Sequence, residues 1–171
     1  IMKPNTIITT LAVVIVLAVL FMWGYAGKGS TAASVQNAGG PVSTSALTSA
    51  ERFHDFGTIS MKNGDVSYDF KVTNPTDKDI LAPTLVTSCM CTRAFIVELD
   101  GSTKGPFGMP GMGYVPPANL TIPPGQSRII RVVYNPNAHG PAGVGRIDRF
   151  AILTDSLGNV LQLEIKALVT P

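Results

Sequence analysis

The sequence predicts an all-β fold, an antiparallel β-sandwich, preceded by one N-terminal transmembrane helix. Residues 66–72 and 161–167 alternate strictly between apolar and polar side chains, and a period of two residues is typical of strands with one buried face. Other short apolar segments, separated by turn sequences and without a helical period, fill residues 51–171 and favour a sandwich. The helix is predicted from an apolar run without any charge at residues 7–26.

The apolar run at residues 7–26 is long enough to cross a membrane. At about 1.5 Å rise per residue it would form a helix roughly 30 Å long, which matches the hydrocarbon core of a bilayer. A cleaved signal peptide is the alternative, but its apolar region usually spans about 7–15 residues. Trp23 and Tyr25 lie near the distal end, where aromatic side chains contact the membrane interface, and we expect them to be partner-binding residues of the helix. We therefore expect residues 1–28 to be a membrane anchor, with the C-terminal part outside the cytoplasm.

Residues 29–50 have the composition of a flexible linker. They are rich in Gly, Ser, Thr and Ala and carry no charge, so they offer too little apolar surface to offset the entropy of ordering them. The remaining residues, 51–171, suffice for one hydrophobic core. The net charge is +2 and no basic run occurs, which argues against nucleic acid as a partner.

Eight strands are expected in the sandwich, in chain order at residues 52–59, 66–72, 80–87, 94–99, 120–122, 128–134, 149–154 and 161–167. Gly, Pro, Asn and Asp separate them in turn sequences at residues 63–64, 74–77, 123–125 and 155–159. The apolar faces of these strands predict the side chains that lie between the two sheets: Phe56, Tyr68, Phe70, Val132, Leu163 and Ile165.

Four motifs within residues 51–171 carry a resemblance. They are His-Asp-Phe-Gly-Thr-Ile at 54–59, the alternating strand that ends in Thr73-Asn74, Thr-Ser-Cys-Met-Cys-Thr at 87–92, and Ile-Pro-Pro-Gly-Gln-Ser at 122–127. In these motifs the chain resembles a bacterial family of unknown function, known by an Asp-Phe-Gly-Thr-Ile opening and a Ser-Cys-Gly-Cys-Thr signature. That family is similar to the Hydin and major-sperm-protein group of immunoglobulin-like domains.

The resemblance implies a seven-stranded immunoglobulin-like sandwich on an exported or membrane-anchored bacterial protein. Together with the predicted helix, it places the domain on the periplasmic side of a bacterial inner membrane. It implies no reaction, because a fold alone does not supply one. Met90 departs from the signature, since the family has glycine at this position.

The segment at residues 100–117 is the candidate partner-binding loop, inserted into the sandwich. A loop of about 18 residues is usually either functional or disordered, and this one contains Phe107, Met109, Met112 and Tyr114. Large apolar side chains on an exposed loop favour contact with a partner protein or with the membrane surface. The alternative is a loop that folds onto its own domain.

Cys89-Met90-Cys91 is the most chemically distinctive motif of the chain. On an extended strand the two thiols would point to opposite faces, whereas a turn at Met90 could bring them into a disulfide. We favour structural cysteines, reduced or bridged. A Cu(I) site is an alternative, with possible extra ligands among Met90, Met109, Met112, His54 and His139, and redox-active thiols are another.

Catalysis finds little support in the sequence, because His54 and His139 are far apart and no nucleophile–base pair can be named. We expect a non-catalytic accessory subunit of a larger membrane protein complex, without a cofactor or a small-molecule substrate. Its partners would be the lipid bilayer and other subunits, docked through the helix, the linker and the loop at 100–117. Two alternatives remain: a copper-handling or thiol-redox protein that uses Cys89 and Cys91, and a free-standing surface-binding module.

Overall fold

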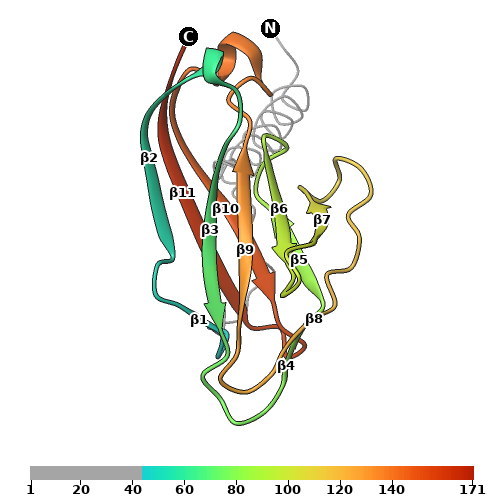
Figure 1. Cartoon of the computed structure of the whole chain (residues 1–171). Helices are drawn as coiled ribbons and strands as arrows, with labels where there is room; N and C mark the ends of the chain where they lie inside the picture. The colour runs from blue at the N-terminus through green and yellow to red at the C-terminus, as the bar shows by residue number, and fades with distance from the viewer. Residues whose placement is uncertain (1–43) are drawn as a thin grey trace, which may run out of the picture. The chain divides into compact units, whose positions relative to one another are not determined.

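Two β-sheets face each other and enclose the apolar core (Figure 1). The structure, a computed structural model, describes residues 44–171, which lie in the unit Val42–Pro171. The expected membrane anchor, with Trp23 and Tyr25, and residues 29–43 of the expected linker lie outside the described residues. Within residues 44–171, no helix has the length and hydrophobicity that a bilayer crossing requires.

The larger sheet has five strands, in the order β1 (Thr48–Ser49), β3 (Val66–Thr73), β9 (Ser127–Tyr134), β6 (Thr92–Val97) and β7 (Thr103–Phe107). The opposite sheet has four, in the order β2 (Phe53–Ser60), β11 (Val160–Thr170), β10 (Gly145–Thr154) and β5 (Thr84–Thr87). A small third sheet pairs β4 (Ile80–Ala82) with β8 (Leu120–Ile122). Two short 3-10 helices, η1 (Met61–Asn63) and η2 (Gly140–Gly143), lie in connections.

The strand order is that of an immunoglobulin-like sandwich, which confirms the predicted class of the described domain. The order β1-β3-β9-β6 corresponds to strands A, B, E and D of that fold, and β5-β10-β11 corresponds to C, F and G. Among the paired strands of the described domain, β2 alone lies parallel to its neighbour, β11. The first strand of the fold is therefore divided, with β1 in one sheet and β2 in the other.

Strands form at all eight expected places, and three differences are informative. Pro83 divides the expected strand at 80–87 into β4 and β5, because proline has no N–H to donate to a neighbouring strand. Residues 44–50, which fall in the expected linker, instead belong to the sandwich, since they include β1 and the fully buried Leu47. Within the expected loop at 100–117, residues Thr103–Phe107 form β7 and pair with β6.

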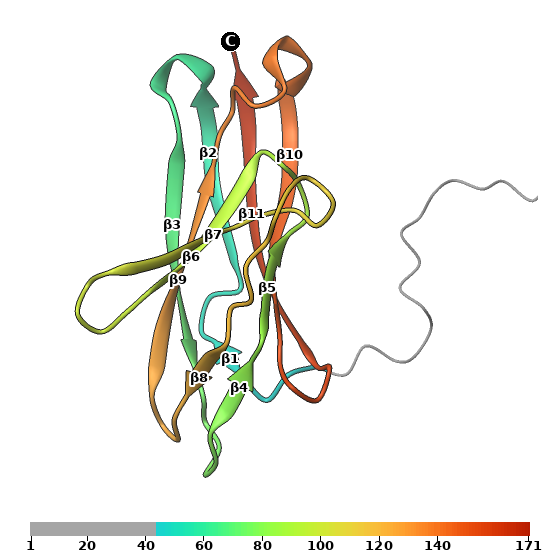
Figure 2. The ribbon, with the colours of Figure 1, turned by 90° about the vertical axis from the view of Figure 1, so that its right-hand side faces the viewer.

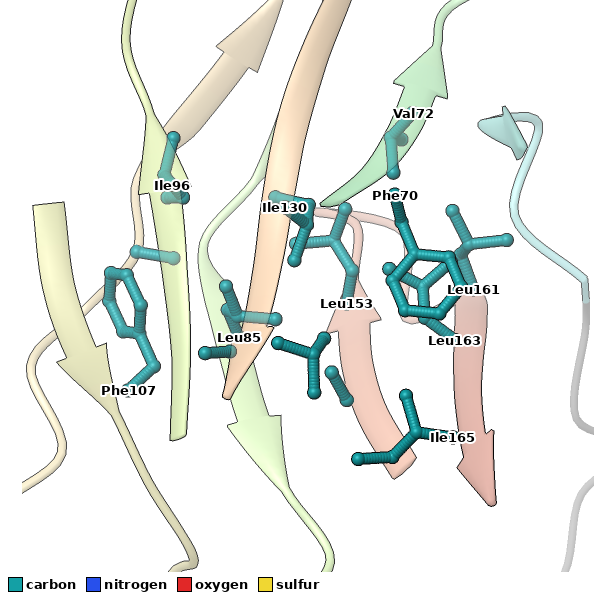
Figure 3. Packing of buried hydrophobic residues seen from close by; sticks show 14 of the residues in the cluster. Phe70, Val72, Leu85, Ile96, Phe107, Ile130, Leu153, Leu161, Leu163 and Ile165 are labelled. Carbon is teal, nitrogen blue, oxygen red and sulfur yellow. The ribbon is translucent and has the colours of Figure 1, made fainter. Parts of the chain in front are cut away.

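The core lies where the apolar faces of the strands predict it. Figure 3 shows Phe70 of β3 pointing toward Leu161 and Leu163 of β11. Four of the predicted core residues are buried, namely Phe70, Val132, Leu163 and Ile165. The other two, Phe56 and Tyr68, are half-buried and pack against the margin of this cluster.

Tyr68 stays at the margin because its hydroxyl needs a polar partner. The hydroxyl donates a hydrogen bond to the carboxylate of Glu51, while the ring stacks on His54 at a centroid distance of 3.7 Å. Buried tyrosines usually keep the O–H bonded in this way. The His54 ring also packs edge-to-face against Phe56, with ring centroids 4.7 Å apart. The packing of His54 in this aromatic group is therefore structural.

Asn74 joins two of the resembling motifs at one end of the sandwich. Its fully buried amide donates to the carbonyl oxygens of Lys78 and Ile122, each at 2.7 Å, and its Oδ1 accepts from Thr76. The backbone N–H of Gly125 donates in turn to the Asn74 carbonyl at 2.9 Å. The turn after β3 is thereby tied to the turn between β8 and β9, which explains the polar residue at a buried position.

Asp155 fastens the beginning of the described chain to the β10–β11 turn. Its buried carboxylate accepts from Ser45 Oγ at 2.9 Å, from the N–H groups of Leu157 and Asn159, and from Asn159 Nδ2. Burial alone would raise the pKa of this carboxyl, but the donors outweigh it and hold the pKa below its usual value. The ionised carboxylate therefore stabilises the folded state.

We expect Asp155→Asn to lower the free energy of unfolding by about 1–3 kcal/mol at neutral pH, because the amide directs a donor at groups that also donate. The pKa of Asp155 is lower in the folded state than its unfolded value of about 3.9. The stabilisation is therefore complete above that pH and is lost as the pH falls through the folded pKa. Urea unfolding of both proteins from about pH 7 to pH 2.5 measures this difference.

The exposed Asp77, in another turn, provides the matched control, and Asp77→Asn should change stability by less than about 0.5 kcal/mol. If Asp155→Asn lowered the free energy of unfolding by the same amount at every pH, the role of the ionised carboxylate would be contradicted.

Candidate functional site

The cysteine motif lies where the chain passes from one sheet to the other. Residues 88–91 connect β5 of the four-stranded sheet to β6 of the five-stranded sheet. The Thr92 N–H donates to the Cys89 carbonyl at 3.0 Å, which closes a tight turn. The buried Thr87 hydroxyl braces this turn, since it lies 2.9 Å from the Thr92 carbonyl oxygen and 3.2 Å from that of Cys89.

Hydrogen bonds to both sheets hold the turn in place. Ser88 bonds to Phe150 of β10 twice: its N–H donates to the Phe150 carbonyl, and its hydroxyl accepts from the Phe150 N–H. On the other side, the Asn135 N–H donates to the Cys91 carbonyl at 2.8 Å. The hydroxyls of Thr87 and Ser88 therefore position the turn, and this accounts for the serine and the first threonine of the motif.

Cys89 and Cys91 form a disulfide. Their Cα atoms are 5.2 Å apart, within the range that a disulfide can span, so the turn does bring the two sulfurs together. Met90 needs no left-handed backbone conformation: within residues 44–171, Asn119 is the only non-glycine residue with a positive φ. Methionine can therefore take the place of the glycine of the resembling signature without backbone strain.

Two side chains from the β9–β10 region approach the disulfide. His139 Nε2 lies 3.2 Å from Cys89 Sγ, and Arg149 Nε donates to Cys91 Sγ at 3.2 Å. Arg149 also lies near Tyr134, whose pKa is raised by burial, an effect that the charge of Arg149 opposes. A guanidinium beside a sulfur favours the thiolate over the thiol once the bond is reduced.

Three of the sequence-predicted candidate ligands come together here. The ligand atoms of Cys89, Cys91 and His139 all lie within 4.8 Å of one another. His54 is not part of this group, since its ring is stacked on Tyr68. Cys91 is 2% exposed and Cys89 9% exposed, whereas His139 is accessible from solvent.

The strand pairing explains why His139 and Arg149 reach the cysteines. Thr92 pairs with Tyr134, at the end of β9, and Thr87 pairs with Ala151 in β10. The turn between β5 and β6 therefore lies beside the connection between β9 and β10. The sequence held no spacing signal for this arrangement, and Arg149 was absent from the candidate residues.

The candidate partner-binding loop lies next to the same turn. A groove of about 260 Å³ separates them, and we call it the Met groove. Its lining combines the turn, β6, β7 and the loop, and includes Met90, Thr92, Pro106, Met109, Met112 and Tyr114. In Figure 2 the segment that follows β7 (yellow) turns back and runs down beside β5 to β8. Met112 and Tyr114 are 58% and 86% exposed, so they are accessible to a partner.

Phe107 does not contact solvent, and the expectation that it binds a partner is wrong. It pairs with Ala94 of β6 at the end of β7, which directs its ring into the core, where it is fully buried. Met109 is half-buried in the Met groove. Trp23 and Tyr25, the other expected partner-binding residues, lie outside the described part of the chain.

Comparisons with known proteins bear on the fold. No family model and no curated protein matches the sequence. The chain is similar to a Porphyromonas gingivalis W83 protein of unknown function, with 13% identity and a TM-score of 0.52 over 77% of this chain and 50% of that one.

It is also similar to the VesB protease of Vibrio cholerae, with 13% identity and a TM-score of 0.45 over 71% of this chain and 31% of that one. The PapD-like domain 7 of human CEP192 has 11% identity and a TM-score of 0.45, over 80% of this chain and 96% of that domain. The chain thus spans half of the P. gingivalis protein and less than a third of VesB. At 13% identity, the likeness to the P. gingivalis protein shows the fold alone.

We expect Thr87→Val to lower the free energy of unfolding by about 1–3 kcal/mol, because valine keeps the shape but removes the hydroxyl that braces the cysteine turn. Thr84→Val, at an exposed position of the same strand, should have an effect below about 0.5 kcal/mol. Urea unfolding of the oxidised proteins measures both. Equal stability of the two variants would contradict the bracing role.

Proposed function

We propose that this chain is a non-catalytic accessory subunit of a larger membrane protein complex, and that its sandwich binds a partner subunit in the Met groove. One observation carries the proposal: large exposed side chains from two separate segments line one groove. Met90 belongs to the cysteine turn, while Met112 and Tyr114 belong to the loop that follows β7. Exposed apolar side chains gathered in this way are typical of protein-binding surfaces.

The types of side chain in the groove suit a protein partner. Methionine is flexible and polarisable and adapts to irregular apolar surfaces, and tyrosine combines a large apolar ring with a polar tip. Arg93 also lines the groove, but its guanidinium is paired with Asp65 at 2.8 Å. The groove therefore presents mainly apolar contacts, and the partner segment that fits it carries aliphatic or aromatic side chains.

The loop is held in position at both ends, which favours binding. At its beginning, the Thr87 N–H donates to the Gly108 carbonyl at 3.1 Å. At its end, the N–H of the fully buried Ala118 donates to the Pro83 carbonyl at 2.8 Å, and Lys104 Nζ donates to the Ala118 carbonyl. A surface that is already ordered loses less conformational entropy when a partner binds.

The predicted anchor at residues 1–28 supports the membrane part of the proposal. It would hold the sandwich beside the bilayer, where subunits of a membrane complex are available at high effective concentration. The periplasmic side of a bacterial inner membrane is the proposed location, as the sequence predicts. The disulfide is consistent with this location, because disulfides persist in oxidising compartments.

The proposal predicts that Met112→Ala/Tyr114→Ala weakens binding of the partner subunit about tenfold or more, because each removed side chain contributes to the interface. The full-length protein and this variant are each extracted from the native membrane in mild detergent. The proteins that co-purify are then quantified by mass spectrometry. Both side chains are exposed, so thermal unfolding of the variant should match that of the wild type.

Leu99→Ala/Leu157→Ala serves as the matched control, because both leucines are exposed and neither lines the groove. It should retain every partner. Retention of the same partners by the groove variant would show that the Met groove is not the docking site. A wild-type protein that co-purifies with no other subunit would instead favour a free-standing surface-binding module.

A further inference from the structure

We infer that the reduced cysteine turn binds one Cu(I) ion through Cys89 Sγ, Cys91 Sγ and His139 Nε2. These ligand atoms lie within 4.8 Å of one another, and Cys89 Sγ is 3.2 Å from His139 Nε2. Once reduction breaks the bond between the two sulfurs they are free to separate, and an ion about 2.0–2.3 Å from each sulfur and from the nitrogen can then be bound by all three atoms. The inference goes beyond partner docking and does not depend on it.

Metal binding requires that the disulfide be reduced first. A dithiol reductant supplies the two electrons: one of its thiolates attacks Cys89 Sγ, and Cys91 leaves as a thiolate. The second thiol of the reductant then attacks the mixed disulfide, releases Cys89, and leaves the reductant as a cyclic disulfide. Cu(I) binds the two thiolates and displaces the protons that remain on them.

The surroundings of each sulfur suit this order of events. Cys89 is the more accessible of the two, at 9% exposed against 2% for Cys91. The Arg149 N–H already donates to Cys91 Sγ at 3.2 Å, so the leaving thiolate forms next to a positive charge. A stabilised thiolate is a better leaving group in thiol–disulfide exchange.

Charge and ligand type both favour Cu(I) over Zn²⁺. Thiolates are soft ligands, and three soft or intermediate ligands satisfy Cu(I), whereas structural zinc sites are closed by four. Cu(I) with two thiolates carries one net negative charge, which the Arg149 guanidinium offsets. Zn²⁺ with the same two thiolates would be neutral, so the nearby cation gives it no such stabilisation.

Backbone hydrogen bonds hold the ligands in position without a metal. The Asn135 N–H donates to the Cys91 carbonyl at 2.8 Å, and Asn137 Nδ2 donates to the Met61 carbonyl at 2.8 Å. The Gly140 N–H donates to the Asn137 carbonyl at 3.0 Å, which fixes the backbone on both sides of His139. The backbone that carries His139 is therefore held beside Cys89 by the fold itself.

The test uses the full-length protein in detergent, reduced with a phosphine and kept free of oxygen. Cu(I) is titrated in the presence of the chromophoric chelator bathocuproine disulfonate, and thiols are counted in parallel. The chelator is used in an excess that removes weakly bound, adventitious copper, and under this condition we expect one copper per chain to remain bound. X-ray absorption should show two sulfur ligands and one nitrogen ligand. A tenfold excess of Zn²⁺ should not displace the copper.

His139→Ala should weaken copper binding at least tenfold, while His54→Ala, which removes the other histidine, should leave it unchanged. Because His139 is exposed, its variant should remain folded, which circular dichroism verifies. Cys89→Ser/Cys91→Ser should bind no copper. The inference is overturned if the reduced wild type loses its copper to the chelator, or if His139→Ala retains copper as tightly as the wild type does.

Discussion

The short passage between the two sheets is the constraint on which the rest of this structure depends. β5 pairs with β10 in one sheet and β6 pairs with β9 in the other, and only residues 88–91 connect them. The Thr92 N–H donates to the Cys89 carbonyl at 3.0 Å, which closes this short connection into a tight turn. The turn brings Cys89 and Cys91 together, which an extended strand would keep on opposite faces.

The same pairing places three further parts of the chain beside the turn. The β9–β10 connection brings His139 to Cys89, and β10 brings Arg149 to Cys91. The loop after β7 is attached to β5 through Thr87, so the Met groove forms next to the cysteines. The proposed docking surface and the proposed Cu(I) site thus share one end of β5 and use different side chains, which lets their roles be tested separately.

Strands in which apolar and polar residues alternate regularly are predicted correctly from the sequence. Segments without such an alternation are missed. The alternation at residues 66–72 correctly placed Phe70 in the core, because a strand of this length repeats its pattern several times. β1 has two residues and no detectable period, so its attachment through the buried Leu47 was not foreseen. The glycines and prolines around Phe107 predict a loop, but β6 pairs with this residue and directs its side chain inward.

The candidate site was predictable only as a set of possibilities. The Cys-x-Cys spacing allowed a turn, and the choice of His139 over His54 depends on strand register between distant segments.

The most direct test of this arrangement is NMR of the imidazole resonances of both histidines in the oxidised and the dithiol-reduced protein. The account predicts that reduction shifts the ring resonances of His139 and leaves those of His54 in place. Unchanged His139 resonances, or equal shifts of the two rings, would contradict the placement of His139 beside the disulfide.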